Sequence, residues 1–188
     1  MSKLRSNTLF ILVVLAALLG SGYASASPAV TPSTVQPMIA VQSFMVPMIS
    51  VSSFSDTYKK IGTLATFNVL SSNSMVELVF NGRIYVQSFS GDATGANFEL
   101  RVDGMATEYG VARAYVRDLE AGERIPVSIT GLFHNLAVGP HTASMYVNVA
   151  WLGSGTNAQV NPGGWETDHL VVKEYTPIGF VYLPLTQK

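Results

Sequence analysis

The sequence contains no cysteine, so no disulfide can stabilise the fold and no cysteine can carry a lipid anchor. Charged residues are also scarce: they form 12% of the chain, against roughly 25% in an average soluble domain. The formal net charge is −1, and the basic residues form no patch. A role in binding nucleic acid or an anionic membrane therefore has no electrostatic support.

Residues 1–26 have the three parts of a secretory signal peptide. Lys3 and Arg5 give a basic start, residues 9–19 form an apolar stretch, and the small residues 24–26 precede an expected cleavage after Ala26. The apolar stretch is shorter than the roughly 20 residues of a spanning helix. An uncleaved N-terminal anchor is the alternative. We expect a secreted protein, extracellular or at the cell surface, with no membrane contact after signal cleavage.

Residues 27–55 form a Pro/Ser/Thr-rich N-terminal extension with an internal repeat. The segments PMIAVQSF (37–44) and PMISVSSF (47–54) share six of eight positions at a period of ten. The alternation within each copy suits an extended strand, and the prolines forbid a central place in a sheet. These segments are predicted to pair with neighbouring subunits. The alternative is that one copy is the first strand of the domain itself.

Residues 56–188 show a series of short alternating segments with turns about every ten residues and no helical periodicity. This pattern predicts an all-β domain, an antiparallel β-sandwich of the jelly-roll type with about 8–10 strands. An up-and-down barrel is the alternative. Residues 153–164 are predicted to form a Gly/Asn-rich loop. The clearest strand is residues 142–151, whose inward face is predicted to be Ala143, Met145, Val147, Val149 and Trp151.

Four motifs resemble the C1q/TNF-like jelly-roll domains of exported and phage-associated proteins. They are FELRVDG (98–104), Gly131-Leu132, AVGPHT (137–142) and LVVKE (170–174), and the resemblance spans residues 61–175. It implies a ten-stranded jelly roll, usually trimeric, that binds ligands through loops and has no catalytic residues. The chain lacks the collagen-like stalk of many members and adds the repeat and an apolar tail. No binding residue of the family is therefore carried over.

Chemistry-bearing motifs are missing from the sequence. The three histidines, His134, His141 and His169, do not have the spacing of a zinc site, and no Gly-x-Ser-x-Gly elbow accompanies the Asp168-His169 pair. The glycines around residue 155 are not followed by a lysine and a helix, as a phosphate loop requires. We expect no catalytic residues, no metal site and no cofactor, and hence no enzyme.

Two functions remain. The first is a structural subunit that self-assembles into a homo-oligomer or filament, partly through extended terminal strands. The expected assembly-strand residues are Met38, Ile39, Val41, Phe44, Met48, Ile49, Val51, Phe54, Ile178 and Phe180. The alternative is a carbohydrate-binding module that uses loops at one end of the sandwich, since an exposed tryptophan beside amide side chains suits a sugar. The candidate ligand residues are Asn157, Gln159, Asn161 and Trp165, although Trp165 filling the end of the sandwich is the other interpretation.

Overall fold

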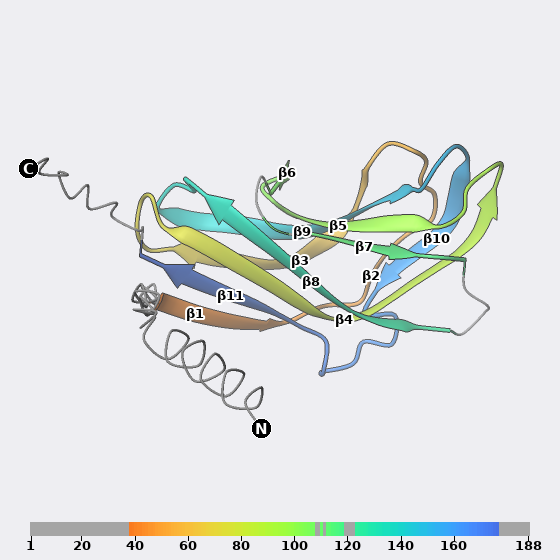
Figure 1. The fold of residues 1–188 in the computed structure, drawn as a ribbon. Helices are drawn as coiled ribbons and strands as arrows, with labels where there is room; N and C mark the ends of the chain where they lie inside the picture. The colour runs from red at the N-terminus through yellow and green to blue at the C-terminus, as the bar shows by residue number, and fades with distance from the viewer. Residues whose placement is uncertain (1–37, 108–109, 111, 119–122, 177–188) are drawn as a thin grey trace, which may run out of the picture. The chain divides into compact units, whose positions relative to one another are not determined.

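The computed structural model describes residues 38–107, 110, 112–118 and 123–176 (Figure 1). The expected signal peptide and the tail residues Ile178 and Phe180 lie outside this part of the chain. Within it, every regular element is a β-strand. The strands are β1 (Met38–Met45), β2 (Ile49–Val51), β3 (Lys59–Val69), β4 (Met75–Ser90), β5 (Ala96–Val102), β6 (Met105–Ala106), β7 (Arg113–Val116), β8 (Ile125–His134), β9 (Gly139–Val149), β10 (Ser154–Val160) and β11 (His169–Tyr175).

No membrane-spanning helix is found among the described residues.

Two antiparallel sheets form the domain. Sheet A has the order β1-β11-β4-β8, and β10 and β2 extend it beside the second half of the long strand β4. Sheet B has the order β3-β9-β5-β7, with the short β6 also paired to β5. The two orders use eight strands, and β2, β6 and β10 are left out of this count. Numbered 1 to 8 along the chain, these strands have the order 1-8-3-6 in sheet A and 2-7-4-5 in sheet B. This is the strand order of a jelly roll, so the predicted fold class is confirmed.

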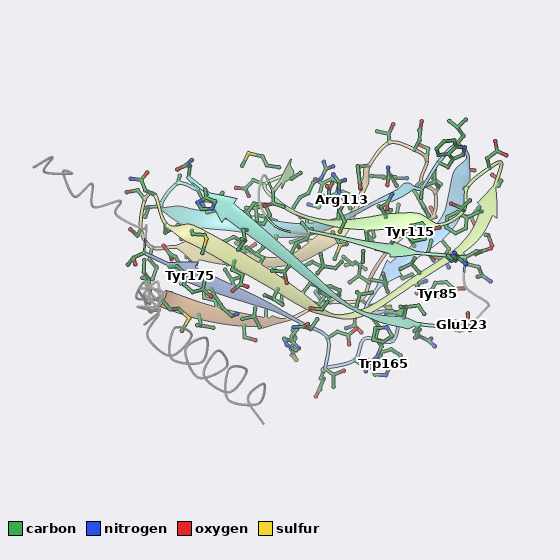
Figure 2. The ribbon with its side chains drawn as sticks, viewed as in Figure 1. Tyr85, Arg113, Tyr115, Glu123, Trp165 and Tyr175 are labelled. Carbon is green, nitrogen blue, oxygen red and sulfur yellow. The ribbon has the colours of Figure 1, made fainter. Side chains whose placement is uncertain are left out.

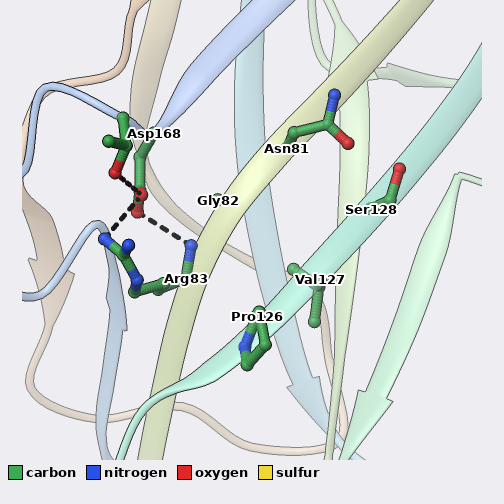
Figure 3. Close-up of a pocket in the computed structure, with 8 residues that line it drawn as sticks. Asn81, Gly82, Arg83, Pro126, Val127, Ser128 and Asp168 are labelled. Atoms are coloured by element: carbon green, nitrogen blue, oxygen red, sulfur yellow. Dashed lines mark hydrogen bonds and ion pairs between the residues drawn. The ribbon is translucent and has the colours of Figure 1, made fainter.

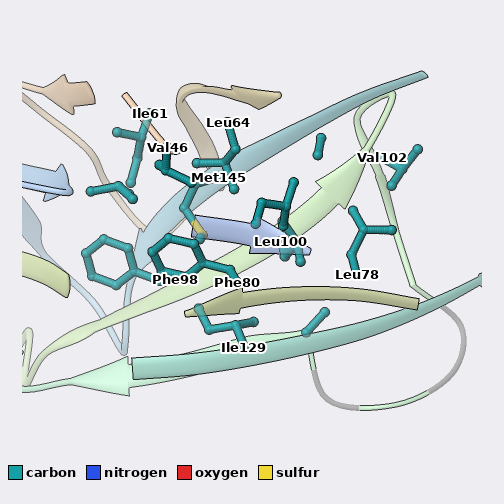
Figure 4. Close-up of a cluster of buried hydrophobic side chains, with 14 of the residues drawn as sticks. Val46, Ile61, Leu64, Leu78, Phe80, Phe98, Leu100, Val102, Ile129 and Met145 are labelled. Carbon is teal, nitrogen blue, oxygen red and sulfur yellow. The ribbon is translucent and has the colours of Figure 1, made fainter. Parts of the chain in front are cut away.

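The core fills the space between the two sheets (Figure 4). Successive side chains of a strand point to opposite faces, so every second residue of a half-buried strand can be apolar. On β4, Leu78 and Phe80 follow this rule and are buried; on β5 and β9, Phe98, Leu100 and Met145 meet them from the opposite sheet. Burial of such side chains contributes about 1.5–3 kcal/mol each relative to exposure, which suits a fold without disulfides.

Both copies of the repeat belong to this domain. The first copy forms β1 and pairs with β11, whereas the second contains β2 and pairs with β10. Val46 and Phe54 are buried in the common core. The domain boundary expected after residue 55 is therefore not observed, because residues 38–55 supply two strands of sheet A.

Two local predictions differ from the structure. Residues 154–160, expected in a loop, form β10, because the long β4 offers them a partner strand from Ile84 to Ser90. Trp151, expected in the core, is 72% exposed. Strand β9 ends at Val149, and the chain then turns with a φ of 95° at Trp151, so the alternation no longer applies there. The other four inward residues of that strand are buried as predicted: Ala143, Met145, Val147 and Val149.

Candidate functional site

A polar hollow lies on the outer face of sheet A, where β4 and β10 run side by side. The ladder places Tyr85 opposite Gln159 and Gln87 opposite Asn157. The phenol of Tyr85 donates a hydrogen bond to the amide oxygen of Gln87, and the Gln159 amide donates to Asn157 Oδ1 at 3.3 Å. We call this cavity of about 220 Å³ the amide hollow. Its lining is Tyr85, Arg124, Asn157, Gln159 and Pro162.

A second hollow of about 380 Å³ lies further along β4 and β8 (Figure 3). We call it the Arg83 hollow. Asp168 borders it and is buried, and its carboxylate accepts hydrogen bonds from the backbone N–H of Arg83 at 2.8 Å and from Nη1 at 3.0 Å. This pair fixes the arginine and neutralises its charge. The lining of the hollow is Asn81, Gly82, Arg83, Pro126, Val127, Ser128, Thr167 and Asp168.

Trp165 links the two hollows. The centre of its ring lies 4.1 Å from the guanidinium carbon of Arg83 and 5.2 Å from that of Arg124, and each arginine lines one hollow. The residue is 39% exposed, so it does not fill the end of the sandwich. Tyr85 and Trp165 lie on the sheet A side of the domain, and Arg113 and Tyr115 on the sheet B side (Figure 2). The two hollows and Trp165 together form the outer-face site.

Asn161 has a structural role rather than the ligand contact expected of it. Its side chain is buried, with a φ of 49° at the turn after β10. The amide nitrogen donates to the carbonyl of Val46 at 2.8 Å and to that of Trp165 at 3.1 Å. Its oxygen accepts a hydrogen bond from the Trp165 backbone N–H at 2.8 Å. All these bonds hold the loop that carries the tryptophan.

The outer-face site carries mainly polar, uncharged side chains around two arginines. An amide side chain offers both donors and acceptors, as does a tyrosine hydroxyl. The carboxylate of Asp168 is occupied by Arg83, and among the described residues no group of three metal-ligating side chains occurs. The arrangement places hydrogen-bond donors and acceptors of uncharged side chains on the outer face of sheet A.

The residues expected in assembly strands fall into two groups. On β1 and after it, Met38, Ile39, Val41 and Met48 are exposed. The others that the structure describes are at least half-buried against their own core: Phe44, Ile49, Val51 and Phe54. Both copies of the repeat therefore pair and pack mostly within their own domain, and an exposed apolar surface remains on β1.

The outer face of sheet B carries a charged network that the sequence did not reveal. Glu99 is buried, and its carboxylate is compensated by two hydrogen bonds. Arg101 Nε and Arg113 Nε donate to its two oxygens, each at 2.7 Å. The guanidinium carbon of Arg101 lies over the rings of Tyr58 and Tyr146, at 4.7 and 4.6 Å from their centres. Glu99 and Arg101 are two residues apart on β5, whereas the pairing of β7 and β9 with β5 brings Arg113 and Tyr146 to them from distant parts of the chain.

His141 and Asp103 form a second pair on the turns of sheet B, 2.6 Å apart. Burial alone would lower the pKa of His141, but hydrogen bonds to the Ala137 carbonyl and to Asp103 outweigh it, so the pKa is raised. Burial would likewise raise the pKa of Asp103, but hydrogen bonds from the Thr142 backbone and from His141 lower it. The pair fixes two turns to each other and lies away from both hollows.

No protein-family model matches the chain, and no curated protein matches it. Similar solved structures include the sugar-binding C-terminal domain of EclA (14% identity, TM-score 0.33), which aligns over 80% of this chain and 89% of that one. Eiger TNF from S. frugiperda (15% identity, TM-score 0.34) aligns over 81% and 99%. Dimeric latent PorU from Porphyromonas gingivalis (11% identity, TM-score 0.35) aligns over 74% of this chain and 14% of that one. The weak resemblance to TNF-like domains is thus also found in the structure, and scores this low carry no functional conclusion.

Proposed function

We propose that this protein is an exported, non-enzymatic binding module whose ligand is a carbohydrate held at the outer-face site. One observation carries the proposal: the two amides Asn157 and Gln159, the Tyr85–Gln87 pair and the Trp165–arginine stack share one face of sheet A. Packing of both repeat copies into their own domain supports a binding module over strand exchange between subunits.

The chemistry of the site favours sugar hydroxyls over charged ligands. Each hydroxyl of a sugar donates one hydrogen bond and accepts others, and amide side chains match both roles. Asp168 compensates the charge of Arg83, which weakens any preference for phosphate or carboxylate groups. Trp165 is 39% exposed, and the part of its indole that the arginines leave uncovered adds an apolar surface for the C–H face of a sugar ring.

The link that Trp165 makes between the two hollows favours a chain of sugars over a single unit. Each is small, at about 220 and 380 Å³; the lining of the amide hollow is largely polar, and that of the Arg83 hollow combines polar and apolar groups. Trp165 contacts one arginine from each. An oligosaccharide lying along the outer face would place successive units in the two hollows, with the tryptophan between them.

The test is affinity electrophoresis of the purified chain in gels that contain soluble neutral polysaccharides of glucose, mannose, galactose, xylose or N-acetylglucosamine. We expect retardation by at least one polymer. The double variant Asn157→Ala/Gln159→Ala should lose about tenfold or more in affinity, since each lost hydrogen bond contributes about 0.5–1.5 kcal/mol. Trp165→Ala should weaken binding by a similar factor.

Asn97→Ala provides a matched control, because Asn97 is also a partly buried strand amide but lies on the outer face of sheet B, bonded to Asn148. Its affinity should equal that of the unmodified chain. Urea unfolding of each variant separates loss of binding from loss of folding. No retardation by any polymer, or equal loss in the control, would refute the carbohydrate proposal.

A further inference from the structure

We propose that the free edge of β1 pairs antiparallel with β1 of a second copy of this chain, so that sheet A continues through a two-fold symmetric dimer. This interface is independent of the outer-face site.

The position of β1 in the sheet is the first reason. Strand β1 pairs with β11 on one side, and no other strand of the described residues pairs with its opposite side. The Val46 N–H donates to the carbonyl of Asp168 at 2.9 Å, which continues the β1–β11 ladder. Backbone groups of an antiparallel strand alternate in direction. Even-numbered residues therefore face β11, and the N–H and C=O groups of Val41, Ser43 and Met45 point to the free edge.

The side chains of the same strand give the second reason. Ile39, Val41 and Met45 are 38%, 52% and 69% exposed and lie on the outer face of the sheet. Soluble proteins usually protect an edge strand with a charge, a proline or a bulge. Between residues 40 and 46 the chain has no charged residue and no proline, and the irregularity in pairing lies before Ala40. The backbone of β1 therefore has none of these protective features between residues 40 and 46, and another strand could pair with it.

The strand is also complementary to itself. Pairing about a two-fold axis at Gln42 sets Ile39 opposite Met45 and Val41 opposite Ser43 of the partner. Both residues of each such pair are odd-numbered, so their side chains lie on the same, outer face of the sheet. The exposed apolar side chains of the two copies would therefore form one continuous surface. The amide of Gln42 does not obstruct this axis, because it is turned toward sheet B and bonds the backbone of Asn68 at 2.7 and 3.2 Å.

The chain's own tail is a poorer occupant of this edge. Strand β11 ends at Tyr175 beside Met38, where β1 begins. A tail that turned back along the free edge would have to pass over β1 and would then run parallel to it. Parallel pairing is slightly weaker per residue than antiparallel pairing, which a second copy provides directly.

Sedimentation of the full chain between about 1 and 100 μM tests the proposal, a range over which dimers of ordinary strength dissociate. We expect a monomer–dimer equilibrium whose dissociation constant rises at least tenfold in Val41→Lys and in Ser43→Pro. Val138→Lys is the matched control, since this valine is 61% exposed in the turn between β8 and β9. It should leave the equilibrium unchanged.

Because the chain lacks cysteine, the register can be tested by cross-linking. The double variant V41C/S43C should form a covalent dimer on mild oxidation, since facing residues of paired strands lie about 5.5 Å apart. V138C should not. A monomer throughout the range, or an oligomer such as a trimer that Val41→Lys does not weaken, would overturn the proposal, whatever the outcome for polysaccharide binding.

Discussion

Substitution of Phe54 by alanine tests whether the second copy of the repeat belongs to the core. Its ring is buried and packs edge-on against Phe89, with centres 6.1 Å apart. Removal of a buried phenylalanine side chain costs about 3–5 kcal/mol. A hollow of about 510 Å³ borders Phe54, so we expect the lower end, about 3 kcal/mol. With a urea m-value of about 2 kcal/mol/M, the unfolding midpoint should fall by about 1.5 M.

Gly155 provides a double-mutant cycle with the same ring. A Cβ at Gly155 would overlap the ring of Phe54, so Gly155→Ala should cost about 1–3 kcal/mol by overpacking. In the Phe54→Ala background the space is empty, and the added methyl group should cost less than about 1 kcal/mol. Met48→Ala, at a 63% exposed position of the same repeat copy, should change stability by no more than about 0.5 kcal/mol. A loss below about 1 kcal/mol for Phe54→Ala, together with additive effects in the cycle, would refute the packing of the second repeat copy into the core.

Three further outcomes follow from the described contacts. Met145→Asp should abolish folding, measured as loss of soluble protein and of the circular dichroism signal, because it buries an unpaired charge, whereas Trp151→Asp should cost less than about 1 kcal/mol. Asp168→Asn should lower the urea-unfolding free energy by about 1–3 kcal/mol and weaken polysaccharide binding, since the arginine loses its charged partner; unchanged values would contradict its positioning role. The raised pKa of His141 stabilises the folded state fully below pH 6.5, and this stabilisation is lost as the pH rises through the folded-state pKa of His141. The lowered pKa of Asp103 also stabilises the folded state, and this stabilisation is lost as the pH falls through the folded-state pKa of Asp103. In His141→Asn the urea midpoint should therefore vary less between pH 6 and pH 9 than in the unmodified chain, and an identical slope would exclude this linkage.

Alternation of apolar residues was enough to predict the fold class and most of the core. The alternation correctly predicted which residues of β9 point inward, from Ala143 to Val149. This succeeded because β9 pairs with a strand on each side and buries one complete face. It failed at Trp151, where a backbone turn ends the strand. It also failed for β10, whose glycine, serine and asparagine residues have low strand propensity and which forms only because β4 is long enough to pair with it.

The candidate site was only partly accessible to sequence reasoning. Asn157, Gln159 and Trp165 are close together in the chain and include the amide–tryptophan signal. Tyr85 and Arg124 are far from them in the sequence and join them only through the β4–β10 register and the loop before β8. The repeat drew attention to residues 38–54, but a repeat cannot tell whether its partner strands belong to the same molecule.

The hydrogen bonds of Asn161 have a consequence for the thermodynamics of ligand capture. Because this one amide already ties Trp165 to the end of β1 at Val46, the loop is ordered when the protein folds and not when a ligand arrives. Immobilising a flexible side chain on binding costs about 0.5–1.5 kcal/mol, and a loop that is rigid beforehand avoids that cost. Ligand association at the outer-face site should therefore proceed without a preceding conformational step. The observed association rate should rise in proportion to ligand concentration and should not reach a plateau. An Asn161→Ala chain would transfer the cost of loop ordering from folding to binding.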